Sequence, residues 1–246
     1  MYVIYMEIRK GHAMRIACVW EHNGDDTLLY AANLPGAFTR GANREIAVEK
    51  MEAEVRSFLQ WMGAAVPDVI SVEVVQEAAC DLQVLDADSD VLFDGERQPL
   101  TMEEYTSLKA LALKSASDFQ KLYNAIPDQD QSDAPSRKTF YGQVPRTARE
   151  MYLHTKNVNA YYFGEVGVDA DNEGTILVCR ERGFSALEEN PTFLENPVVL
   201  GSYGEAWTVR KMLRRFLWHD RIHAKAMYRM ARRTFGLDCV ENIFFF

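Results

Sequence analysis

The sequence predicts an α+β protein in which a small N-terminal α/β domain (residues 1–95) precedes an all-α four-helix bundle (residues 96–246). Short β-rich runs and one helical segment occur before residue 95, whereas long segments with helical spacing follow it. The charge also changes there: residues 1–95 carry 7 Lys+Arg and 16 Asp+Glu, and the remaining residues carry 20 of each. The composition, 48% hydrophobic and 26% charged, is ordinary for a globular protein.

The N-terminal domain is expected to hold an antiparallel sheet with one helix packed on it. Two β-rich runs, residues 14–21 and 27–32, are separated by Asn23-Gly24, a favoured hairpin turn. The other expected strands are residues 1–10, 69–75 and 82–85.

The helix of this domain is expected over residues 44–62, where Asn43 can cap its first turn. A turn over residues 34–38, with the sequence Leu-Pro-Gly-Ala-Phe, precedes it. This order of strand, Leu-Pro-Gly turn and Glu/Ala-rich helix over residues 27–62 resembles the core of HicB-type antitoxin domains. HicB proteins usually add a DNA-binding element, but nothing basic and compact follows here, so the resemblance does not imply a repressor.

The first helix of the bundle is expected to begin at Thr101, because Thr101 and Glu104 match a capping box. Its inward seam steps by 3 and 4 residues through Tyr105, Leu108, Ala112, Ser115, Phe119, Leu122 and Ile126. A polar loop over residues 128–137 should follow. The other three helices are expected at residues 146–165, 180–189 and 205–235, with Gly236 ending the last.

Three histidines are expected to point into this bundle. His219 and His223 are spaced i, i+4 within an apolar stripe of the last helix, and His154 belongs to the stripe of the second. Neutral imidazole is a good ligand for Zn, Ni or Fe, so the three predict a metal site. The alternative is that each is a hydrogen-bonded core residue, since an i, i+4 histidine pair alone is a weak metal signal.

Residues 100–246 resemble the DinB-like bundle family (the DinB/YfiT superfamily). The longest match is residues 204–223, which are similar to the family's Glu-x-Trp-Thr-x-Arg-x-x-Leu stretch followed by its His-x-x-x-His helix. Residues 151–154, ending in His154, and the closing residues 235–237 also match. The resemblance implies that His154, His219 and His223 bind a divalent metal.

The same resemblance implies a function. Well-understood members transfer or add low-molecular-weight thiols, or hydrolyse amide-like bonds at the metal. We therefore expect a metal-dependent thiol transferase or hydrolase with Zn or Ni, or else Fe or Mn, acting on a small-molecule substrate or thiol. No thiol-binding signature is visible, and no catalytic residue is assigned.

Other interpretations stay open. One is a non-catalytic binding or regulatory protein whose metal is structural or vestigial. Another is a zincin protease, although Asp220 replaces the glutamate of its HExxH motif. Cysteine–histidine catalysis is neither supported nor excluded by the sequence.

The last helix is strongly basic. A solvated face is the first interpretation. The alternative is that it docks on the acidic face of the helix over residues 44–62, in the same chain or in a second subunit; its arginines could also hold an anionic thiol cofactor. The basic residues are Arg210, Lys211, Arg214, Arg215, Arg221, Lys225, Arg229, Arg232 and Arg233, and the acidic ones are Glu45, Glu49, Glu52 and Glu54.

Residues close to the histidines are expected to serve packing. Tyr161, Tyr162, Trp207 and Trp218 are interpreted as core aromatics rather than a substrate cage. The apolar residues 243–246 should pack on the bundle or on a partner subunit, and a homodimer is expected.

Several protein classes are disfavoured. The acidic first domain would repel a phosphate backbone, so no nucleic acid is expected. No apolar run is long enough to cross a membrane, and the first residues lack signal-peptide features. Four scattered cysteines without a CxxC pair suggest reduced thiols and a cytoplasmic protein.

Overall fold

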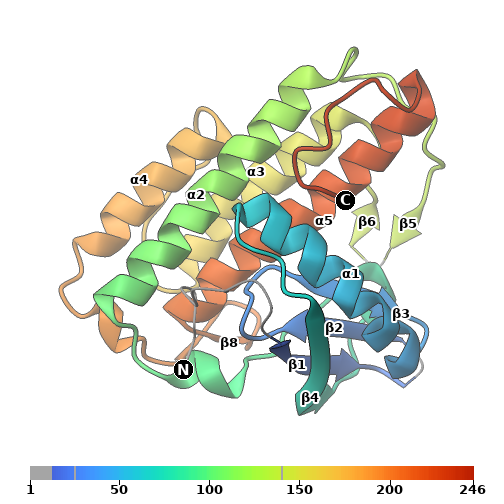
Figure 1. The fold of residues 1–246 in the computed structure, drawn as a ribbon. Helices are drawn as coiled ribbons and strands as arrows, with labels where there is room; N and C mark the ends of the chain where they lie inside the picture. Colours follow the sequence, from blue (N-terminus) through green and yellow to red (C-terminus); the bar gives the residue numbers. More distant parts are fainter. Residues whose placement is uncertain (1–12, 25, 140) are drawn as a thin grey trace.

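A mixed four-stranded sheet with one helix precedes four long helices in the computed structural model, which describes residues 13–24, 26–139 and 141–246 (Figure 1). The predicted α+β class is confirmed. The expected strand at residues 1–10 lies outside the described residues. Among the described residues, no helix combines the length and the apolar character needed to cross a bilayer.

The sheet has the order β3-β2-β1-β4, and its last strand differs from the prediction. β1 and β2, and β2 and β3, are antiparallel, but β4 pairs with β1 in parallel. The expected antiparallel sheet is therefore wrong for β4, because α1 crosses between the two edge strands and β4 runs in the same direction as β3. The bounds are Ala13–His22 (β1), Thr27–Ala31 (β2), Phe38–Gly41 (β3), Arg44–Met62 (α1) and Val69–Ala79 (β4). We call these elements the sheet unit.

Both faces of the central strand β2 are buried, whereas one face of the edge strand β4 is exposed. One face of the sheet, including Ile16 and Leu29, packs on α1 and joins the core of the helices. The other face, including Leu28 and Tyr30, packs on Trp218 of the last helix. The turn at Gly36 also lies against that helix, where a Cβ would come 2.8 Å from the Leu217 Cβ. The sheet unit is thus seated on the last helix.

The segment after β4 is not the strand expected at residues 82–85. Val84–Asp86 forms a 3-10 turn, η1, which ends at Ala87 with a left-handed backbone (φ 63). Val84 is buried against the sheet, so its apolar character reflects packing under a turn rather than a strand.

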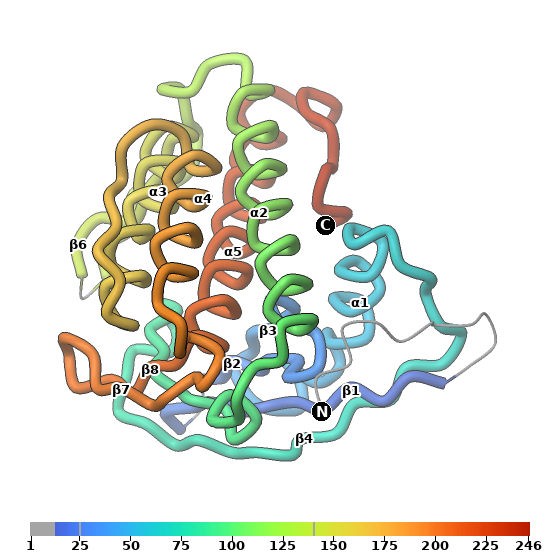
Figure 2. The backbone as a smooth tube through the Cα atoms, turned by 90° about the vertical axis from the view of Figure 1, so that its left-hand side faces the viewer, coloured from blue at the N-terminus to red at the C-terminus, as the bar shows by residue number. Residues whose placement is uncertain are grey.

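Four helices run side by side above the sheet unit (Figure 2). Each begins at a threonine whose hydroxyl accepts a hydrogen bond from the N–H three residues later, which fixes the helix start. The capping box of Thr101 and Glu104 is confirmed, and the whole predicted seam of that helix is buried. The helices are Met102–Ala125 (α2), Ala148–Gly164 (α3), Ile176–Glu188 (α4) and Val209–Phe235 (α5).

Short elements connect the helices. α4 begins earlier and α5 later than expected, because Thr175 and Thr208 are their caps. The expected boundary at residue 95 falls in the 3-10 turn η2. The connecting elements are Asp94–Arg97 (η2), Lys138–Thr139 (β5), Gly142–Gln143 (β6), Phe193–Glu195 (η3), Val199–Leu200 (β7) and Ala206–Trp207 (β8).

The basic half of α5 is not a solvated face. Arg210, Lys211, Arg214, Arg215 and Arg221 are buried, which corrects the first interpretation. The docking hypothesis is confirmed for one acidic residue in the same chain: Glu54 of α1 lies 2.6 Å from Arg221 Nε and 3.2 Å from Lys225 Nζ. By contrast, Glu45 and Glu49 are exposed and Glu52 pairs with Arg56.

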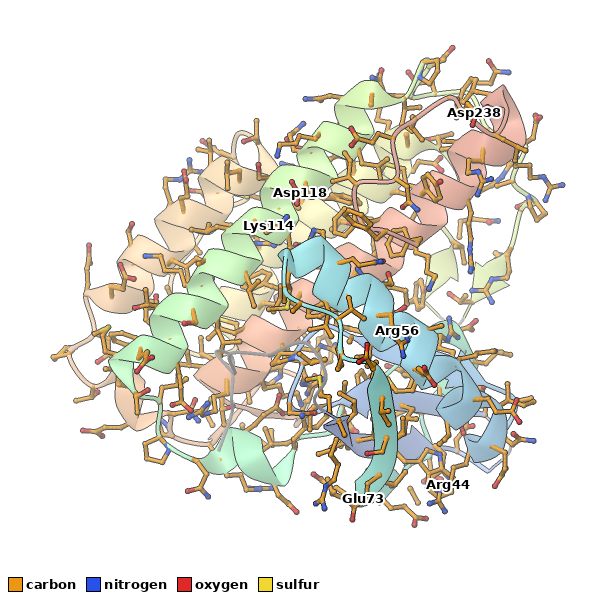
Figure 3. All side chains as sticks on the ribbon, viewed as in Figure 1. Arg44, Arg56, Glu73, Lys114, Asp118 and Asp238 are labelled. Atoms are coloured by element: carbon orange, nitrogen blue, oxygen red, sulfur yellow. The ribbon has the colours of Figure 1, made fainter. Side chains whose placement is uncertain are left out.

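The end of α1 is attached to α2 and to the C-terminal residues. Trp61 Nε1 donates a hydrogen bond of 3.0 Å to Asp118, which also accepts from Lys114 on the same face of α2 (Figure 3). Phe244 stacks on Trp61 with ring centroids 5.6 Å apart. The apolar residues 243–246 thus pack on their own chain.

Candidate metal centre

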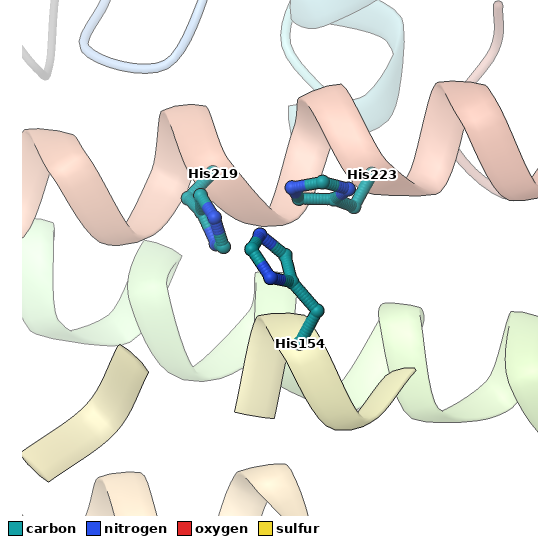
Figure 4. A group of neighbouring side chains, drawn as sticks. All are labelled: His154, His219 and His223. Atoms are coloured by element: carbon teal, nitrogen blue, oxygen red, sulfur yellow. The ribbon is translucent and has the colours of Figure 1, made fainter. Parts of the chain in front are cut away.

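α3 and α5 bring His154, His219 and His223 together. His219 and His223 project one turn apart from α5, and His154 faces them from α3 (Figure 4). The ring centroids lie 5.1 Å (His154–His219), 4.6 Å (His154–His223) and 4.5 Å (His219–His223) apart. One ring nitrogen from each lies within 4.8 Å of the other two, so the cluster could hold a metal ion.

The surroundings favour neutral imidazoles. Burial lowers the pKa of His154, and burial followed by the charge of His154 lowers the pKa of His223 to about 3. Burial also lowers the pKa of His219 well below its ordinary value, with further lowering by His223 and His154. At neutral pH each ring therefore keeps a lone pair, which is the form that binds a metal.

Two further observations indicate that these residues suit a metal ion. Bonds of about 2.0–2.1 Å from zinc to nitrogen place the ligand nitrogens within about 4 Å of one another, so the observed cluster is only slightly wider than a ligand set. His219 is 7% exposed, and its Nδ1 is buried without a hydrogen-bond partner. An unsatisfied buried nitrogen costs free energy, and coordination is one way to satisfy the imidazole.

The cluster lies at a cavity of about 890 Å³ between the helices and the sheet unit. The helices contribute the histidines, Tyr161, Tyr162, Arg215 and Trp218. The sheet unit and the segment after it contribute Arg40 and residues 86–90, and two loops contribute Tyr141 and Tyr203. The cavity is large enough for a small organic molecule beside the histidines.

The wall at residues 89–91 is held from both sides. Arg215 Nη1 donates to the carbonyl of Ser89 and Arg214 Nη2 to that of Val91, each at 2.9 Å. The Glu21 carboxylate accepts from the N–H groups of Asp90 and Val91 at 3.0 and 3.1 Å. Because charged groups from α5 and β1 hold the same short segment, the wall is fixed relative to the histidines.

Sequence reasoning identified the three histidines but missed the rest of the cavity. Arg215 had a detectable signal, because it precedes His219 by four residues and so shares its helix face. No signal in the sequence predicted that residues 86–90 line the cavity, because their position depends on contacts across more than 100 residues of sequence.

The aromatic residues divide into two groups. Trp207 is fully buried and lies outside the cavity lining, as expected of a core residue. Tyr161, Tyr162 and Trp218 line the cavity, so they pack and also shape the site.

Two rival chemistries lack support in this cavity. Asp220 is fully buried in a salt bridge with Arg180, so it is not placed as the base of a zincin. Among the described residues that line the cavity there is no cysteine; Cys18 and Cys179 are buried elsewhere, and Cys80 and Cys239 are half-buried.

Comparisons of the chain with protein-family models, curated proteins and solved structures found no match. What the molecule itself presents is a mixed sheet with a helix, followed by a helical region that contains a buried three-histidine cluster.

Proposed function

We propose that this chain is a divalent-metal-dependent enzyme of the DinB-like kind, with His154, His219 and His223 as ligands. The observation that carries the proposal is the convergence of three imidazoles, held neutral by burial, at one side of a cavity of about 890 Å³. Imidazole donors suit Zn or Ni first, and Fe or Mn as alternatives.

A metal held by three imidazoles keeps a position for water or a thiolate and lowers the pKa of that ligand. The chain's own residues would do the rest. Packing around α5 keeps the imidazoles uncharged, and the rings of Tyr162 and Trp218 form the cavity wall beside His219. The proposed reaction is thiol transfer or hydrolysis of a small molecule, as the DinB-like resemblance implies.

The HicB-like resemblance is part of the same proposal. β2, the turn over residues 34–38 and α1 follow one another in the order of the resemblance, with β3 between the turn and α1. In this chain the sheet unit would complete the cavity, because Arg40 belongs to β3 and the segment after β4 supplies residues 86–90.

A non-catalytic metal-binding or regulatory protein is the alternative. It is favoured by the position of Asp220, since the carboxylate next to His219 is paired with Arg180 instead of facing the cavity. Turnover of a thiol with an electrophile, or of an amide-like substrate, would exclude it.

Metal content, measured by elemental mass spectrometry, tests the centre. We expect near-stoichiometric divalent metal in the wild type and its loss in His154→Ala, His219→Ala and His223→Ala. His22→Ala is the matched control, because His22 lies on β1, outside the cluster, and contacts Glu77 instead. Circular dichroism establishes that each variant is folded.

Two results would contradict the metal centre. One is a wild-type protein that contains no metal and takes none up on reconstitution. The other is metal that remains bound in all three cluster variants.

A further inference from the structure

Arg215 differs from the other buried basic residues of α5. Arg214, Lys211 and Arg221 lie within 2.8 Å of the carboxylates of Glu96, Glu205 and Glu54. Within the part of the chain that the structure describes, Arg215 has no carboxylate at ion-pair distance, although the charges of Glu205, Glu21 and Asp88 interact with it from farther away. Its guanidinium contacts the neutral Ser89 carbonyl and the Tyr162 hydroxyl, and its Nε has no partner.

This charge, which has no direct ion pair, lies beside the histidines. Arg215 is 9% exposed and lines the cavity one helical turn before His219. The rings of Trp218 and Tyr162 lie 4.8 and 5.6 Å from its Cζ and offset part of the cost of burial. A buried cation that has no direct ion pair and faces a cavity is suited to an anionic ligand, because charge-assisted hydrogen bonds strengthen in a dry site.

The lining carries three arginines, Arg40, Arg137 and Arg215, against four carboxylates, so a single negative charge on the ligand is favoured over two. Glu205 is paired with Lys211, and Asp86 with Arg137, so these two carboxylates are compensated. Asp88 and Asp90 also line the cavity and would repel a phosphate dianion more than a carboxylate. Tyr161, Tyr203 and Trp218 offer ring surface for an apolar body.

We propose that Arg215 binds the carboxylate of the ligand that the three-histidine centre handles, so that the cavity selects a small monocarboxylate with an apolar body. The inference rests on the proposed metal centre and adds the substrate class to it.

Calorimetric titration of the metal-loaded protein tests this subsite, with phenylacetate, neutral phenylacetamide and inorganic phosphate as probes. Arg215→Met removes the charge, and Arg215→Lys keeps the charge without the planar fork. Arg229→Met is the matched control, since Arg229 is exposed on the same helix and outside the cavity. Metal content is measured on every sample.

We expect phenylacetate to bind the wild type and Arg229→Met equally, and Arg215→Met about tenfold more weakly or worse. Arg215→Lys should lose an intermediate amount of affinity for phenylacetate. This variant provides the test if Arg215→Met does not fold. Phenylacetamide should bind weakly, and its affinity should be the same in the wild type and in the Arg215 variants. If Arg215 had only a structural role, substituting it would change the stability of the protein but not the difference in affinity between phenylacetate and phenylacetamide.

The inference is overturned if phenylacetate does not bind the metal-loaded wild type, if its affinity is unchanged in the Arg215 variants, or if phosphate binds more tightly. In those cases the metal centre stands. Absence of metal uptake, in contrast, contradicts the metal centre and the inference together.

Discussion

Lys211 carries a buried charge on α5. Lys211 is fully buried, and its Nζ lies 2.8 Å from both the Ala206 carbonyl and the Glu205 carboxylate. Burial is the largest influence on its pKa and lowers it to about 8, although Glu205 acts in the opposite direction. The lysine is therefore held in an environment that only partly compensates its charge.

This predicts a pH dependence of stability. Between the folded pKa of about 8 and the unfolded pKa near 10.5, the unfolded chain binds more protons than the folded one. The free energy of unfolding of the wild type should thus rise with pH in this window relative to Lys211→Met, by at most about 1.4 kcal/mol per pH unit. Urea unfolding from about pH 7 to about pH 10 measures the difference. Parallel curves for the two proteins would contradict it.

At the residue scale, spacing alone located the histidines, because periods of 3 and 4 place side chains on one helix face. Spacing did not show that Arg210, Lys211 and Arg214 are buried. The carboxylate partners of Arg210 and Arg214, which are Glu104 and Glu96, are more than 100 residues away in sequence, so no local pattern indicates them.

Helix packing at the element scale depends on one close contact between α3 and α4. A Cβ at Gly183 of α4 would come 2.1 Å from the Phe163 ring of α3, and that ring is fully buried. Glycine at this position therefore sets how closely the two helices approach, and α3 in turn carries His154.

Gly183→Ala should lower the free energy of unfolding by about 1–2 kcal/mol, because overpacking outweighs the better helix propensity of alanine. Gly164→Ala is the control: a Cβ there meets nothing within 4 Å, so it should be neutral or slightly stabilising. Urea denaturation of both variants measures the effect. Equal stability of the two would mean that Phe163 moves aside at no cost.

Local chemistry made some element boundaries predictable. Asn43 and Thr101 were recognised as caps because the hydrogen-bonding residue and the helical period coincide. The η1 turn was mistaken for a strand because a short apolar run looks the same in either state. The parallel pairing of β4 depends on the crossover of α1, which the sequence of β4 does not encode.

For the whole molecule, the metal centre links ligand binding to stability. A ligand that binds only the folded state stabilises it by mass action, by about 2.7 kcal/mol at 100 times its Kd. For a chain of this size, we expect saturating metal to raise Tm by about 5–10 °C. Differential scanning calorimetry of metal-free and metal-loaded protein measures the shift.

Two variants test whether the rise in Tm comes from metal bound at the histidine cluster. His154→Ala should lose the shift in Tm, whereas His22→Ala should keep it, since His22 lies outside the cluster. A shift that persists in His154→Ala would place the stabilising metal elsewhere.

The origin of the three ligands has a consequence for how the chain matures. His219 and His223 belong to one helix, but His154 comes from another that is more than 60 residues earlier, and the wall at residues 89–91 is held by Glu21 and Arg215. A nascent or unfolded chain therefore offers at most a pair of ligands, and the full set exists only after α3, α5 and the sheet have docked. Tight metal retention then reports completed folding, because a half-folded chain with two ligands at most competes only weakly for the ion.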